Sequence, residues 1–156
     1  MFVVYKSEYN PPNLTGQVGG NISTSVLSGY INELFYHVDS LPSGVTEATQ
    51  QYRKIFIKNT YTKTSTNTRV WFDAIEHEDQ IYIARSTGMV DFSSNAATPP
   101  SGVSGWTTPT NYVEGINIGT LSPNAYTGVW IRQTLSGISS PDPYASFRIT
   151  IGGIIT

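Results

Sequence analysis

The chain has 156 residues, a formal net charge of -2, and charged side chains at only 13% of its positions. It contains no cysteine, which excludes disulfide bonds, thiolate metal sites and cysteine nucleophiles. Nucleic-acid-binding domains normally carry an excess or a stripe of basic residues, so no nucleic acid partner is expected. The length suggests one domain, and the abundance of Ser, Thr, Asn, Gly and Tyr favours β structure.

The first 25 residues predict an extended amino-terminal arm, followed by a single domain over residues 26–156. Residues 2–6, FVVYK, are a short strand candidate. Residues 10–25, NPPNLTGQVGGNISTS, hold two prolines and three glycines, which argues against regular secondary structure there. The apolar run at 2–5 is too short for a signal-peptide core or a membrane span, so no membrane partner is expected.

The arm has little to pack on within itself. Extended arms of this kind usually become ordered by lying on a partner, whose contact offsets the entropy cost of ordering. We therefore expect the arm to bind a partner protein through Tyr9, Pro11, Pro12 and Leu14.

Six or seven strands are expected, because apolar and polar residues alternate between turn signals. In the strands predicted at residues 51–59 and 69–75, alternation directs Ile55, Ile57, Val70 and Phe72 into the core. No strong helix signal and no parallel βαβ rhythm appear. The predicted fold class is therefore all-β, a two-sheet antiparallel sandwich. Further strands are predicted at residues 80–85, 116–121, 125–135 and 146–154.

A long loop is predicted at residues 86–115, which are rich in Ser, Thr, Gly, Pro and Asn. Loops of this length in a compact domain are usually functional or hold short irregular strands. Trp106 lies in this loop, and we expect it either to anchor the loop or to be exposed.

Two stretches resemble immunoglobulin-like domains. KIFIKNTYTKTSTNTRVWF, residues 54–72, resembles the unit in which Asn-Thr ends one strand and the next strand returns after a polar loop. INIGTLSPNAYTGVWIRQT, residues 116–134, resembles the G-x-L-x-P-G crossover between sheets. Asn124 stands at the usual glycine, which asparagine can replace because it accepts a positive φ. The resemblance implies an immunoglobulin-like antiparallel β-sandwich with an extended N-terminal arm.

The combination of YRKIFIKNT, residues 52–60, with VWIR, residues 129–132, resembles a group of small proteins encoded among the virion genes of tailed bacteriophages. These proteins pair a YR-x-I/F-x-I/V-KNT strand with a later VW-I/V-R strand. The resemblance covers about residues 50–135 and the final strand. It implies an immunoglobulin-like structural protein of the virion, but it does not indicate to which part of the particle the protein belongs.

Candidate catalytic and metal-binding groups are few. The only histidines are His37 and His77, and carboxylates surround His77 in IEHEDQ. Such a group can bind a divalent metal, but a solvated turn is the favoured interpretation. No nucleophile elbow and no phosphate-binding glycine loop are present. We therefore expect a protein that is not an enzyme and has no catalytic residue, cofactor or metal.

Large aromatic side chains alternate with the core isoleucines and are expected on the outer face of the strands. Phe56, Trp71 and Trp130 belong to this set, and Arg132 shares their face. They can stabilise neighbouring strands as aromatic and cation–aromatic pairs, or lie beneath a long loop or the arm. Alternatively, they form a contact surface, because aromatics and arginines are enriched at protein interfaces. The pattern leaves open whether Phe56 and Trp71 are a cross-strand pair or part of that surface.

The expected function is that of a noncatalytic phage virion protein, a capsid decoration or cement protein on the capsid surface, assembled in the host cytoplasm. Its expected partners are the major capsid protein and neighbouring copies of itself, as a homo-oligomer on the particle. The alternatives are a tail or baseplate subunit, and a carbohydrate-binding host-adhesion module whose aromatic rings stack on sugars. The expected contact residues are Tyr9, Pro11, Pro12, Leu14, Phe56, Trp71, Trp130 and Arg132.

Overall fold

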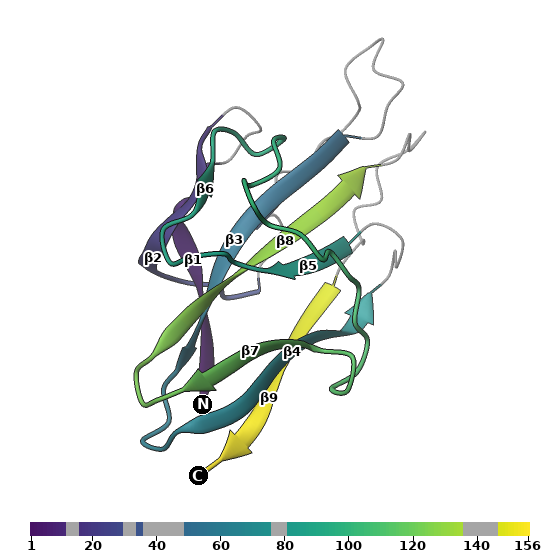
Figure 1. Cartoon of the computed structure of the whole chain (residues 1–156). Helices are drawn as coiled ribbons and strands as arrows, with labels where there is room; N and C mark the ends of the chain where they lie inside the picture. Colours follow the sequence, from purple (N-terminus) through teal and green to yellow (C-terminus); the bar gives the residue numbers. More distant parts are fainter. Residues whose placement is uncertain (12–15, 30–33, 36–48, 76–80, 136–146) are drawn as a thin grey trace.

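The computed structural model describes residues 1–11, 16–29, 34–35, 49–75, 81–135 and 147–156 (Figure 1). In these residues the secondary structure is entirely β, with nine strands and no helix. The strands are β1 (Phe2–Tyr9), β2 (Val18–Val26), β3 (Thr49–Asn59), β4 (Ser65–Ile75), β5 (Ile81–Arg85), β6 (Phe92–Ser93), β7 (Ile116–Leu121), β8 (Tyr126–Leu135) and β9 (Phe147–Ile155).

The strands form two antiparallel sheets. The larger sheet has the order β5-β8-β3-β1-β2-β6, and the smaller has the order β7-β4-β9. Figure 1 shows β3 and β8 running side by side through the molecule, with β7, β4 and β9 together at one end. This arrangement confirms the predicted all-β antiparallel sandwich.

The main core lies between the sheets. It contains Ile55, Ile57, Val70 and Phe72, all of which are buried as alternation predicted. Ile83, Val129 and Ile131 extend it along the larger sheet, and Phe147, Ile149 and Ile151 of β9 pack against it. Asn124 has a φ of 65°, which confirms that it occupies the turn position where a glycine is usual.

A second buried cluster covers the opposite face of the larger sheet. It consists of Val18, Tyr52, Ala96 and Trp130, with Val103 and Trp106 packed against it. Segments between β5 and β7 therefore cover this face, which confirms the alternative that a long loop folds over it. Phe56 and Trp130 are completely buried, so their assignment to an exposed contact surface is wrong. Alternation determines which face a residue occupies, but it does not determine whether another segment covers that face.

Residues 2–9 and 18–25 of the expected arm are instead strands of the larger sheet, and the strand candidate at residues 2–6 is confirmed as part of β1. Strand β1 pairs with β3 from Phe2 to Lys6, and β2 pairs with both β1 and β6. The glycines argued against a strand, but Gly19 and Gly20 lie within β2 at positive φ, where the β1–β2 register shifts. The predicted contact residues Pro12 and Leu14 lie outside the described residues.

The segment from β3 to β4 crosses from one sheet to the other. Phe56 and Trp71 therefore belong to different sheets and are not a cross-strand pair. The Phe56 ring instead packs edge-on against Tyr126, at 5.9 Å between centroids, and the Trp71 ring packs against Tyr112, at 5.7 Å.

Replacing Trp130 with alanine should test the second cluster. We expect the free energy of unfolding, measured by urea denaturation, to fall by about 3–5 kcal/mol, because a large buried side chain leaves a cavity. Val113, which is 81% exposed, is the control, and its replacement by alanine should change the free energy by less than about 0.5 kcal/mol. Equal effects of the two substitutions would contradict the burial of Trp130.

Candidate functional site

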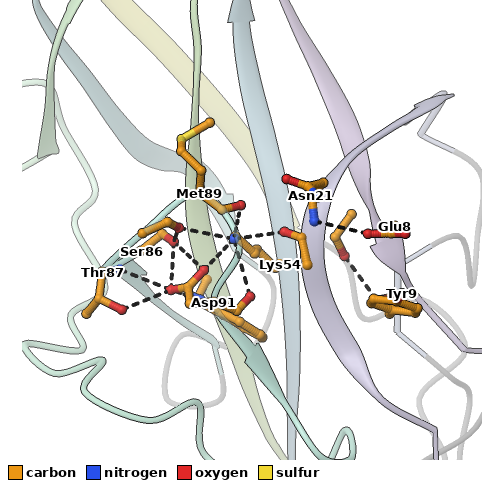
Figure 2. A network of polar contacts seen from close by, with 12 residues as sticks. Glu8, Tyr9, Asn21, Lys54, Ser86, Thr87, Met89 and Asp91 are labelled. Atoms are coloured by element: carbon orange, nitrogen blue, oxygen red, sulfur yellow. Dashed lines mark hydrogen bonds and ion pairs between the residues drawn. The ribbon is translucent and has the colours of Figure 1, made fainter.

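Lys54 lies at the centre of a polar network on the covered face of the larger sheet (Figure 2). Alternation along β3 places it on the same face as Tyr52 and Phe56, and its side chain is fully buried. A buried ammonium group is unfavourable unless acceptors surround it. We therefore define the candidate site as Lys54 together with the groups that accept its hydrogen bonds.

Four backbone carbonyls from two segments lie within hydrogen-bonding distance of Lys54 Nζ, which shares its three N–H groups among them. They belong to Gly20 of β2, at 3.0 Å, and to Gly88, Met89 and Asp91, at 3.2, 2.9 and 3.3 Å. The Phe56 ring centroid lies 4.7 Å from the same nitrogen and adds a cation–π contact. Lys54 thus attaches both β2 and residues 88–91 to the middle of β3.

The Asp91 carboxylate neutralises this ammonium group through Oδ1. Its Oδ2 accepts hydrogen bonds from Trp130 Nε1 and from the Thr87 backbone N–H, both at 3.0 Å. Ser86 Oγ lies 2.7 Å from each carboxylate oxygen. The centre is therefore a hydrogen-bonded ion pair whose partners come from β3, β8 and the loop between β5 and β6.

The ionisation of both groups reflects this geometry. Burial alone would raise the pKa of Asp91, but hydrogen bonds from Lys54, Ser86 and Trp130 outweigh burial and hold this pKa below its usual range. Burial lowers the pKa of Lys54, and the hydrogen bond and charge of Asp91 oppose that effect. The carboxylate is therefore firmly ionised at neutral pH.

Two glycines allow the segments to approach so closely. A Cβ at Gly19, whose φ is 99°, would lie 2.6 Å from the Asp91 carbonyl oxygen and 2.8 Å from the Trp130 ring. A Cβ at Gly128 of β8 would lie 2.7 Å from Lys54 Cε. A larger residue at Gly19 would push β2 away from the loop and from Trp130, and a larger residue at Gly128 would displace the Lys54 and Ser86 side chains.

The network determines which way the loop side chains point. Because the carbonyls of residues 88, 89 and 91 turn inward to Lys54, the side chains of Met89 and Val90 are exposed, and Figure 2 shows Met89 directed away from the ammonium group. Phe92 and Tyr9 are also exposed, and both pair with Gly19, from β6 and β1 respectively. We call Tyr9, Met89, Val90 and Phe92 the apolar loop surface.

The other predicted contact residues have internal partners. The Arg132 guanidinium carbon lies 4.1 Å from the Tyr82 ring centroid and 5.1 Å from that of Trp106. Trp106 therefore anchors the long loop, which settles the choice left open by the sequence. The carbonyl of Pro11 accepts a hydrogen bond from Arg53 Nη2 at 3.3 Å.

Trp71 is half-buried on the outer side of the smaller sheet. It packs perpendicular to Tyr112, whose hydroxyl donates to the Asn67 carbonyl at 3.1 Å. The Arg69 guanidinium donates to two backbone carbonyls nearby, those of Val113 and Gly115. Of the two predicted contact tryptophans, Trp71 alone retains exposed surface.

Sequence reasoning missed Lys54 and Asp91, together with Met89, Val90 and Phe92. The available signal was that Lys54 shares one face of its strand with the aromatic residues Tyr52 and Phe56. A lysine in that position implies either that the face is exposed or that a buried partner neutralises the ammonium group. Asp91 lies far from Lys54 in the sequence, and no spacing rule connects them.

Metal-binding groups and membrane-spanning helices do not appear in the described part of the chain. No three histidine or carboxylate side chains there are grouped to hold a metal ion. No helix there has the length and apolar character needed to cross a bilayer. His37 and His77 lie outside the described residues.

Comparison of the chain with family models, curated proteins and solved structures finds no significant match. The functional conclusion therefore depends on the geometry and on the motifs described above.

Replacing Lys54 with methionine should destabilise the protein strongly. The substitution leaves the Asp91 carboxylate buried without its cation, so we expect a loss of about 3–5 kcal/mol in the free energy of unfolding. Urea denaturation measures the loss, and Lys58→Met, at a less buried position of the same strand, is the matched control. A loss below about 1 kcal/mol for Lys54→Met would contradict the assigned role of the ion pair.

Acid should weaken the same centre. Because the folded-state pKa of Asp91 is lowered, its ionisation stabilises the protein above the unfolded value of about 3.9, and this contribution is lost as the pH falls through the folded pKa. The stability difference between the wild type and Asp91→Asn should therefore shrink below about pH 4. Asp73, which bonds Arg148 at the surface, provides the control: Asp73→Asn should have a much smaller effect throughout. A pH-independent difference for Asp91→Asn would argue against this assignment.

Proposed function

We propose that the protein is a noncatalytic structural protein of a tailed-phage virion that binds other virion proteins through the apolar loop surface. One observation carries this proposal: the charged groups of the buried centre are used to hold a loop that exposes the apolar side chains of Met89 and Val90. Neither Lys54 nor Asp91 is presented to solvent as a reactive group, because loop carbonyls and neighbouring donors surround them.

A surface loop held from beneath suits binding. Its backbone conformation is already selected, so association does not have to order it, and less binding free energy is lost. The exposed fractions of Val90 and Phe92, 61% and 55%, leave apolar area that a partner can bury at about 25 cal/mol per Å². The charge on Lys54 is neutralised internally, so the loop favours an uncharged apolar surface as its partner.

Within the virion, we propose the role of a capsid decoration protein on the lattice of the major capsid protein. The resemblance of YRKIFIKNT and VWIR to virion proteins supports this role, as does the low share of charged residues. Repetition over a lattice would turn modest single contacts into strong overall binding. Burial of apolar surface across subunit junctions would then stabilise the head.

Two alternatives predict other locations or ligands. A tail or baseplate subunit would use the same apolar contacts at another place in the particle. A carbohydrate-binding module would need an aromatic ring accessible to sugars, and the burial of Trp130 restricts that role to Trp71 among the predicted tryptophans. Electron microscopy distinguishes a tail or baseplate subunit from a capsid protein by its position in the particle. Glycan-array binding that is lost in Trp71→Ala would support the carbohydrate-binding module.

The proposed location is tested on purified particles. Mass spectrometry should detect the protein in virions, and electron microscopy should place it in many copies on the head. Absence from virions would overturn the proposed function, and density restricted to the tail would overturn the capsid assignment.

The contact surface is tested with a matched pair of substitutions. Val90→Asp introduces a charge into the apolar loop surface, and we expect at least tenfold weaker cosedimentation with particles lacking the protein, because one buried apolar side chain contributes about 1.5–3 kcal/mol. Val113→Asp places the same charge at another highly exposed position and should bind like the wild type. Equal binding by Val90→Asp and the wild type would exclude the loop as the contact.

A further inference from the structure

The exposed edges of the two sheets differ in how well they are protected against pairing with another strand. In the described part of the chain, β6 has only two residues, and β5 is covered where Ile83 bridges Thr107. Strand β7 is interrupted by register shifts against β4, one of them next to Gly119, whose φ is 90°. Short, covered or bulged edges of this kind resist intermolecular pairing.

Strand β9 is neither short nor covered by a described strand. Its register with β4 shifts twice, but in both places the additional residue lies in β4 and not in β9. It has nine residues and pairs only with β4 among the described strands, so it forms one edge of the smaller sheet (Figure 1). Its sequence, FRITIGGII, contains no proline and no lysine, and Arg148 is its single charged residue. Ile154 and Ile155 near its end are 56% and 40% exposed. A long apolar edge whose outer backbone positions are not occupied by any described strand fits another β-strand.

The residues of β9 are compatible with pairing to a second copy of the same strand. A two-fold axis perpendicular to the sheet at Gly153 would make the strands antiparallel and place Ile151 of each copy opposite Ile155 of the other. Ile154 would then lie opposite Gly152 of the second copy, which has no side chain to obstruct it. No like charges meet in this register, because Arg148 lies beyond the paired residues.

Trp71 would become part of this contact. Its ring lies beside Gly152, where an added Cβ would be 3.0 Å from the ring edge. Ile154 of the second copy, placed opposite Gly152, would therefore pack near the exposed part of the Trp71 ring. The half-exposed tryptophan and the exposed isoleucine would cover one another.

We propose that β9 is a self-association edge, through which two copies of this chain join their smaller sheets by antiparallel pairing of β9 with β9. An isologous contact of this kind closes after two copies and leaves the apolar loop surface, which lies on other strands, available to a different partner. The inference uses a different surface from the proposed function and stands independently of the capsid assignment.

Size-exclusion chromatography with multi-angle light scattering tests this inference on the full chain. The wild type should have the mass of a dimer, and Ile154→Lys should have the mass of a monomer, because a charged side chain on the edge opposes strand pairing. Val90→Lys, the same substitution on the apolar loop surface, should remain dimeric. A monomeric wild type, a dimeric Ile154→Lys variant or open-ended oligomers would overturn the proposal.

Hydrogen exchange provides a second measurement that does not depend on a variant. Backbone amides of β9 should exchange faster when the wild-type protein is diluted, whereas amides of β3 and β8 at the sheet centre should not respond. If β9 exchange is independent of protein concentration, its edge is not paired with a second copy. Failure of the Val90→Asp particle-binding test would leave both of these results unchanged.

Discussion

The structure depends on two neighbouring cations that β3 carries into the interior on opposite faces. Arg53 points into the sandwich, where its Nε donates to the Leu34 carbonyl at 2.9 Å and its Nη2 to that of Pro11. Burial lowers the pKa of Arg53 to about 10, which still leaves the guanidinium charged at neutral pH. Lys54 points to the other face and donates hydrogen bonds to carbonyls of β2 and of the β5–β6 loop. Buried cations need acceptors, so segments distant in sequence are fastened to one central strand.

This requirement connects the fold to the proposed function. The acceptors of Lys54 are main-chain carbonyls, so satisfying the ammonium group constrains the backbone and leaves the loop side chains free to face solvent. Met89 and Val90 are exposed for that reason. A loop fixed through its backbone presents apolar side chains in a defined arrangement, which is what a protein contact surface needs. The edge strand β9 belongs to the other sheet, so a lattice contact and self-association can operate through separate surfaces.

Much of the fold could be predicted from the sequence, because alternation has a direct physical cause. Ile55, Ile57, Val70 and Phe72 are buried as expected, and the strand predicted at residues 116–121 has those bounds in β7. The site could not be predicted in the same way. Phe56 and Trp130 followed the alternation rule, but the rule says nothing about the segments that bury them, such as the loop that covers Trp130. The β2 strand was missed because Gly19 and Gly20 look like loop residues, although they serve close packing against Trp130 and Tyr9.

The central claim is that the Lys54–Asp91 pair fixes the β5–β6 loop locally, and hydrogen exchange resolved by residue tests it most directly. In Lys54→Met, under conditions where the protein remains folded, the amides of Thr87 and Gly20, which donate to the Asp91 carboxylate and carbonyl, should lose protection. Amides in β4 and β9, which belong to the smaller sheet, should keep theirs. Unchanged exchange at Thr87 and Gly20, or an equal loss of protection in both sheets, would contradict the account.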